Sequence, residues 1–102
     1  MARSSISLKC LTSNYDDMKV YVLVCDWAWD FQPDMEVLVF KNRETAIRKM
    51  NEFAKSFKDN EGNMRKLNAE DHGETYCSFY HDGCWQENHI AWTIYEKELI
   101  RL

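Results

Sequence analysis

The feature that most constrains this fold is a run of apolar residues at helical spacing between Arg43 and Lys58. Apolar side chains recur there at intervals of three and four, at Ala46, Ile47, Met50, Phe53, Ala54 and Phe57. This spacing places them on one face of an α-helix, and that face must be buried against another element. Asn42 precedes the run and has the side-chain oxygen that an N-cap requires, so the helix is predicted to begin at Arg43.

Segments rich in β-branched and aromatic residues are predicted to form the sheet that buries this helix. They are residues 18–25, 35–41, 75–80 and 89–95, and the Asp82-Gly83 pair between the last two is typical of a turn. The intervening residues 26–34 and 58–74 contain Pro, Gly, Asn and Asp, and are predicted as connections, the second holding one helical turn. The order β-β-α-β-β predicts an α+β fold, with a small, mostly antiparallel sheet and the helix on one face.

The N-terminal residues 1–17 are predicted to be an extension or an additional edge strand. Residues 5–11 alternate weakly between apolar and polar side chains and would supply a fifth strand. Residues 18–102 contain no linker rich in Pro, Gly or Ser, so we expect them to form a single domain. Apolar residues make up 45% of the 102-residue chain, which is enough for a core that needs no cofactor.

The net charge and the cysteines limit the class of partner and the cellular compartment that we expect. The formal net charge is −4, whereas a protein that neutralises phosphates usually has a basic surplus, so direct nucleic-acid binding is not expected. The sequence shows neither a signal-peptide core nor an apolar run of membrane length, so we expect no membrane partner and a cytoplasmic location. In that compartment Cys10, Cys25, Cys77 and Cys84 are expected to be free thiols.

The first predicted strand is apolar on both of its faces. One alternation set consists of Val20, Val22 and Val24, and the other of Tyr21, Leu23 and Cys25. A single helix covers only one face of a small sheet, so the second face needs another cover. We expect that cover to be a second copy of the chain, giving a homodimer, or a partner protein.

The segment that follows this strand intersperses acidic residues with aromatic ones. Together with a tryptophan in a later polar segment, its candidate binding residues are Asp26, Trp27, Trp29, Asp30, Asp34 and Trp85. Aromatic residues are enriched at interface hot spots, and acidic neighbours steer a surface toward a basic partner. The alternative is that Trp27 and Trp29, both at odd positions, extend the core face of a long strand.

A group of histidines and cysteines between residues 72 and 89 is the second candidate site. Its members are His72, Cys77, His81, Cys84 and His89. If the last four converge across a hairpin, they supply the four ligands of a tetrahedral zinc site. Their spacing matches no zinc signature, and Cys77 more naturally points into the core with Phe79. A thiol nucleophile at Cys84, with His81 and Asp82 beside it, would be the related catalytic arrangement.

A binding or inhibitory module is therefore a better prediction than an enzyme. The chain has no nucleophile elbow, Gly-rich phosphate loop or H-E-x-x-H motif, and no cofactor is expected. We expect a small acidic protein that binds a protein partner by surface complementarity, in its most concrete form by occupying the basic, nucleic-acid-binding surface of a larger protein. The alternative is a zinc-binding or Cys/His-dependent small enzyme that uses residues 72–89.

Overall fold

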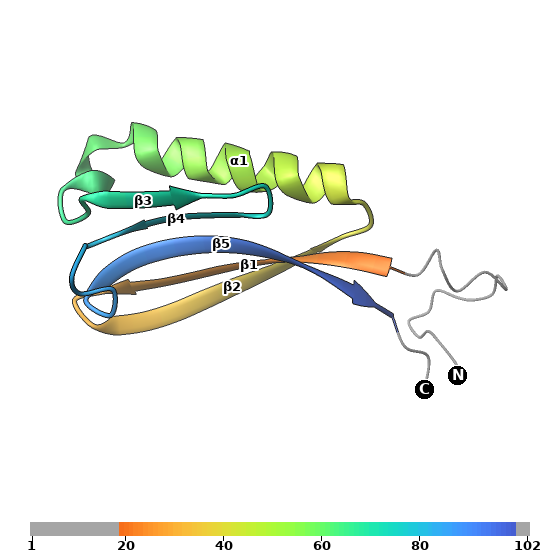
Figure 1. The fold of residues 1–102 in the computed structure, drawn as a ribbon, viewed down its shortest axis with the longest axis horizontal. Helices are drawn as coiled ribbons and strands as arrows, with labels where there is room; N and C mark the ends of the chain where they lie inside the picture. The colour runs from red at the N-terminus through yellow and green to blue at the C-terminus, as the bar shows by residue number, and fades with distance from the viewer. Residues whose placement is uncertain (1–18, 100–102) are drawn as a thin grey trace, which may run out of the picture.

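The computed structural model describes residues 19–99, which form a five-stranded sheet with one long helix on one face (Figure 1). In chain order the elements are β1 (Lys19–Trp29), β2 (Gln32–Phe40), α1 (Arg43–Asp59), the 3-10 helix η2 (Glu61–Met64), β3 (Ala69–His72), β4 (Tyr76–Tyr80) and β5 (Asn88–Glu98). All four strand pairings are antiparallel, and the strand order across the sheet is β2-β1-β5-β4-β3. The predicted α+β class and the antiparallel sheet are confirmed.

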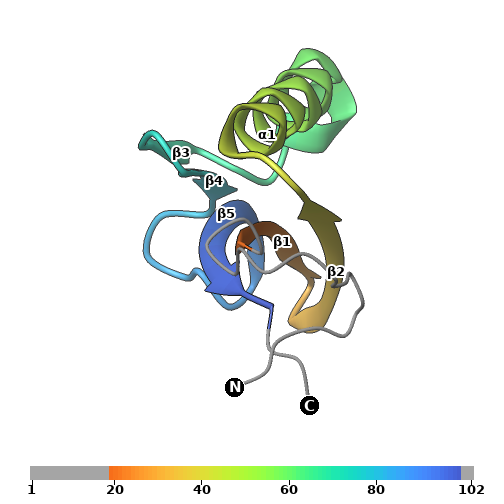
Figure 2. The same ribbon diagram turned by 90° about the vertical axis from the view of Figure 1, so that its right-hand side faces the viewer.

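The helix begins where the sequence predicts. The Asn42 side chain accepts a hydrogen bond from the Thr45 amide at 2.7 Å, which satisfies one of the free amides of the first turn. The face of α1 that contains Ala46, Met50 and Ala54 is buried against the sheet, as the spacing requires. Figure 2 shows α1 lying over one face of the sheet.

The core lies between α1 and the central strands. β1 and β5 are the two longest strands and pair along their whole length, so they carry the middle of the sheet. Leu23, Met50 and Phe79, which come from β1, α1 and β4, are each almost fully buried. Because these three elements are far apart in the chain, the core joins its two halves.

The predicted connection over residues 26–34 is wrong, because β1 and β2 form one long hairpin. β1 continues to Trp29, and only Asp30 and Phe31 make the turn, both with positive φ of 54° and 70°. Such a turn normally contains glycine, which is absent here, so no local signal marks it. Pro33 is tolerated because β2 is an edge strand. The Phe31 amide donates to the Glu87 carbonyl at 3.0 Å and anchors the turn to the β4–β5 loop.

The fifth strand also differs from the prediction. It is β3, which lies inside the predicted connection 58–74, so the order becomes β-β-α-β-β-β; η2 is the helical turn expected in the same segment. β3 is short, polar and at the edge of the sheet, so it lacks the apolar alternation that identifies a strand. Residues 5–11 and the predicted extension 1–17 lie outside the described residues.

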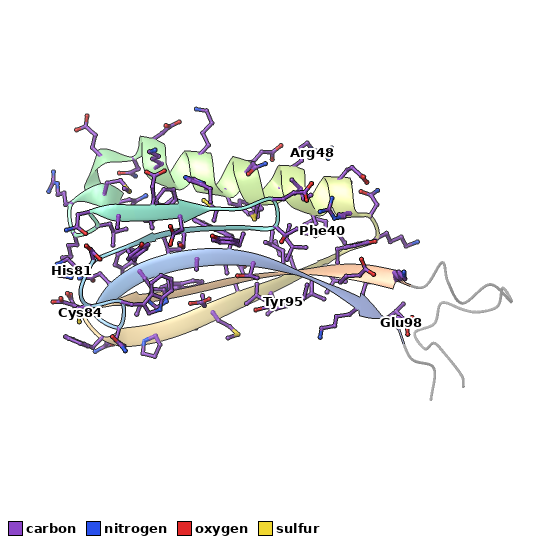
Figure 3. All side chains as sticks on the ribbon, in the orientation of Figure 1. Phe40, Arg48, His81, Cys84, Tyr95 and Glu98 are labelled. Carbon is purple, nitrogen blue, oxygen red and sulfur yellow. The ribbon has the colours of Figure 1, made fainter. Side chains whose placement is uncertain are left out.

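The sheet face opposite α1 exposes apolar side chains. Met35, Val37, Val39 and Tyr95 are between 48% and 60% exposed on this outer face, and Figure 3 shows Tyr95 on the side of the sheet away from α1. Within residues 19–99 no element covers them. In the same part of the chain, no helix combines the length and the apolar character needed to cross a membrane.

Candidate binding groove

A groove opens on the helix-facing side of the sheet, between α1 and the hairpin formed by β1 and β2. Its volume is about 430 Å³, and most of its lining is apolar. The aromatic part of that lining consists of Trp27, Trp29, Phe53, Phe57 and Trp92. We call this feature the aromatic groove. A concave apolar site with few polar groups is the usual form of a ligand or side-chain binding site.

The groove exists because α1 crosses the sheet obliquely. Only Lys41 and Asn42 separate β2 from α1, so the helix starts beside the end of β2. Its last turns lie over other strands, where the Phe57 ring is 5.7 Å from that of Phe79 and 6.0 Å from that of Trp92. The beginning of β2 therefore lies farther from the helix than its end does (Figure 1). The half of the hairpin that contains the two tryptophans is left partly uncovered.

The polar side chains of the groove are Cys25, Glu36 and Asn63. Cys25 and Glu36 face each other across the β1–β2 ladder. Burial raises the pKa of the Cys25 thiol to about 12, and the carboxylates of Asp26 and Glu36 add to this shift. The thiol is consequently uncharged at neutral pH and is not an activated nucleophile. The formal charge of the groove comes from Glu36.

The negative charge beside the groove is not neutralised within the structure. Among residues 19–99, neither Asp34 nor Glu36 takes part in an ion pair. Asp34 lies two residues from Glu36 on the same side of β2, and its carboxylate accepts a hydrogen bond from the Met35 amide at 2.8 Å. Both residues are exposed. The helix-facing side of β2 thus carries two adjacent, unpaired carboxylates.

The structure divides the predicted binding residues between the two faces of the sheet. Trp27 and Trp29 lie on the helix-facing side, pack against the core and line the groove, so the alternative that they extend the core face of a long strand is confirmed. Asp34 lies on the same side, whereas Asp26 points to the opposite one. Asp30, at the hairpin turn, pairs with Lys66 at 2.9 Å.

Trp85 and Asp26 belong to a separate cluster around His89 on the outer face. His89 is buried; its Nε2 is 2.7 Å from the Asp26 carboxylate and its Nδ1 is 2.8 Å from the Trp85 carbonyl oxygen. The Trp85 ring stacks on the imidazole with centroids 4.1 Å apart. Both ring nitrogens therefore contact acceptor atoms of the protein, and the cluster ties the start of β5 to β1 and to the β4–β5 loop.

The residues of the alternative metal site do not converge. Cys77 is buried on the helix-facing side of β4, whereas His89 lies on the outer face of β5. Figure 3 shows His81 and Cys84 at the end of the sheet, where β4 leads into β5. Across the described part of the chain, no three His, Cys, Asp or Glu side chains are grouped as metal ligands would be. Cys25, Cys77 and Cys84 are free thiols, and Cys10 lies outside the described residues.

One contact among the predicted donors has the composition of a thiol catalytic site. The Cys77 sulfur is 3.3 Å from His72 Nδ1, and His72 Nε2 contacts Glu70, which also pairs with Lys58 at 3.0 Å. These bonds lower the pKa of Glu70. Cys77, however, is only 2% exposed, and burial raises the pKa of its thiol. The thiol is protonated and inaccessible to a substrate, so the contact holds the edge strand β3 in place.

The lining residues missed by the sequence prediction are those that come from other elements. Phe53 and Phe57 belong to α1, Trp92 to β5 and Glu36 to β2, and only the fold brings them beside Trp27. Comparison with protein-family models, curated proteins and solved structures finds no match to this chain. The chemistry of the aromatic groove is therefore inferred from its own residues.

Proposed function

We propose that this protein is a binding module that engages a basic segment of a partner protein through the aromatic groove. The observation that supports this most strongly is the unpaired Glu36 carboxylate at a groove walled by aromatic rings. A lysine or arginine side chain combines an apolar stem with a charged head. Its stem would pack on the rings, and its head would pair with Glu36 or Asp34. The net charge of −4 favours the same class of partner.

The position of β2 supports an extended conformation for the bound segment. β2 is an edge strand, and its residues from Gln32 to Val39 are exposed. An extended peptide that pairs with an edge strand gains backbone hydrogen bonds and places alternate side chains on one face of the sheet. On β2 those alternate side chains would lie beside the aromatic groove. In its most concrete form, the partner is a larger protein whose nucleic-acid-binding surface is basic.

A peptide titration tests this proposal. The probes are a short synthetic peptide of alternating lysine and leucine and its counterpart of alternating glutamate and leucine, and binding is followed by tryptophan fluorescence. We expect the lysine peptide to bind, and to bind more weakly as ionic strength rises, because the attraction is screened. Glu36→Gln is expected to weaken its binding by about five- to tenfold, since a charge-assisted contact is lost.

The matched control for that variant is Glu98→Gln, which removes the same charge at the far end of β5 (Figure 3). It is expected to leave the affinity for the lysine peptide almost unchanged. Equal binding of the lysine and glutamate peptides would contradict the proposal. So would an equal loss of affinity in the two glutamine variants, because the effect would then reflect net charge alone.

The outer face supports a second interaction, and we propose that its occupant is another copy of the chain. Val37 and Val39 of β2 face Val24 and Val22 of β1, which makes a continuous apolar surface. The charged side chains on this face lie outside the valine patch: Asp26 contacts His89, Asp71 of the edge strand β3 accepts a hydrogen bond from Tyr80, and Lys97 lies near the end of β5. An apolar patch suits another apolar surface better than it suits a basic segment.

Self-association through the outer face is expected to be weak. Three strand widths and five residues of length give an area of roughly 250 Å² per copy, well below the roughly 800 Å² of a standard interface. Sedimentation equilibrium should therefore show a dimer only at high protein concentration. Val37→Lys is expected to abolish it, and Ser56→Lys, which adds the same charge on the exposed side of α1, is not. A wild-type chain that stays monomeric throughout the concentration series would exclude this dimer.

A further inference from the structure

We infer that the aromatic groove selects an alkylated ammonium, and specifically a methylated lysine side chain of the partner segment, over an unmodified lysine or arginine. This inference rests on the proposed function, because it defines the head group that enters the same groove. Three properties of the groove support it: the arrangement of its rings, its shortage of hydrogen-bond acceptors, and its size.

The rings surround the groove from three elements. Trp27 and Trp29 project from the same face of β1, Trp92 projects from β5, and Phe57 projects from α1. The rings of Trp29 and Phe57 stack with centroids 6.1 Å apart, whereas Phe57 meets Trp92 edge to face at 6.0 Å. The ring planes around the groove thus point in more than one direction. Several aromatic walls around a cation are typical of sites that bind quaternary or methylated ammonium groups.

The polar side chains are too few to replace the hydration of an unmodified basic group. A lysine ammonium has three N–H donors and a guanidinium has five. The acceptors that the groove side chains offer are the Glu36 carboxylate and the Asn63 amide oxygen, since the Asn63 nitrogen donates to the Phe57 carbonyl at 3.0 Å. In the ring-lined part of the groove, beyond the exposed Glu36, unmodified donors would lose water without gaining equivalent partners. Alkylation removes those donors and keeps the charge, so Glu36 still attracts the group.

The size of the groove indicates that it receives more than the head group. A volume of about 430 Å³ leaves space for several methylene groups beside an alkylated nitrogen. A methylated lysine supplies such a stem, and its backbone would lie along the exposed edge strand β2. A free quaternary amine would use the head-group position and gain no contact with β2. The edge strand is therefore the reason to assign the ligand to a partner segment.

The test compares versions of the alternating lysine and leucine peptide that differ at the central lysine. The residue is unmodified in one version, trimethylated in the second, and replaced in the third by a neutral analogue with a tert-butyl group in place of the trimethylammonium. We expect the trimethylated peptide to bind at least about tenfold more tightly than either of the others, because only it combines charge with alkylation. n-Butyltrimethylammonium, the isolated head and stem, is expected to bind much more weakly than that peptide.

Two protein variants test whether the preference for the trimethylated peptide arises in the aromatic groove. Phe53→Leu removes an aromatic wall that is 39% exposed and keeps an apolar side chain, so it should reduce the preference for the trimethylated peptide. Phe31→Leu makes the same change at the exposed hairpin turn, outside the groove lining, and should leave the preference unchanged. An equal effect of these two substitutions would overturn the assignment to the groove.

The remaining outcomes separate this inference from the proposed function. If the unmodified peptide binds as tightly as the trimethylated one, the inference is wrong and the basic-segment function stands. If the neutral tert-butyl peptide binds equally well, the groove recognises apolar shape and not an ammonium. If n-butyltrimethylammonium alone matches the peptide, the ligand is a free quaternary amine and the assignment to a partner fails. If none of the peptides binds, the proposed function fails as well.

Discussion

Replacing Phe79 with alanine is expected to lower the free energy of unfolding by about 3–5 kcal/mol. Phe79 is 1% exposed, and its ring contacts Phe57 of α1, Trp92 of β5 and His72 of β3 at centroid distances of 5.7, 6.3 and 6.1 Å. Truncation leaves a cavity where three elements meet, which the surroundings cannot fill without moving the helix. Since domains of this size are stable by only about 5–15 kcal/mol, the variant should be close to unfolding.

Urea unfolding followed by circular dichroism measures this effect, and Phe53→Ala is its matched control. Phe53 is also a phenylalanine packed near the sheet, but it is 39% exposed and lines the aromatic groove. Its truncation is expected to cost only about 1–2 kcal/mol, because more than a third of its surface is already in water. The same variant should bind the trimethylated peptide more weakly. A loss of stability as large as that of Phe79→Ala would show that the groove is closed core and not a binding site.

The parts of the fold that could be predicted from the sequence are those with local signals. The helix was predicted from Asn42 and from a spacing that α1 alone determines, and its observed start agrees. The β1 strand was identified by β-branched and aromatic residues that continue for several positions. These features depend on residues close together in the chain, so no knowledge of tertiary contacts was required.

The parts that could not be predicted are those fixed by partners distant in the chain. The turn at Asp30 and Phe31 has no glycine, and it is held by bonds to Glu87 and Asn88 from the other end of the chain. β3 contains no apolar alternation and exists because β4 provides its hydrogen bonds. In both cases tertiary contacts override weak local preference.

The contrast between local signals and contacts distant in the chain also explains which residues of the aromatic groove could be predicted. The alternation of acidic and aromatic residues singles out Trp27 and Trp29, but the side of the sheet on which they lie depends on β1 continuing past Asp26. Glu36 and Trp92 join them because each is in register with Cys25, one through β2 and the other through β5. Register between distant strands is not encoded in any one segment, so the groove could be identified only in the folded chain.

Replacing Asp26 with leucine is expected to lower the free energy of unfolding by about 2–3 kcal/mol, because the buried His89 then loses its charged partner. This expected loss in the free energy of unfolding is smaller than for a fully buried ion pair, since the Asp26 side chain is 40% exposed. Asp26→Asn should cost only about 1 kcal/mol, as the amide oxygen still accepts from Nε2.

The matched control for this pair is Lys66→Leu, which breaks the ion pair of Lys66 with Asp30 and leaves Asp30 in the left-handed turn position that suits it. Both side chains of that ion pair are more than half exposed, so the expected cost is below about 1 kcal/mol. A double-mutant cycle with His89→Gln should then show coupling to Asp26 and none to Lys66. Equal costs for the two leucine variants would mean that the Asp26–His89 pair is no stronger than a surface contact. Asp26 lies between Cys25 and Trp27 on β1, so a strong pair would fix the strand that lines the groove from its opposite face.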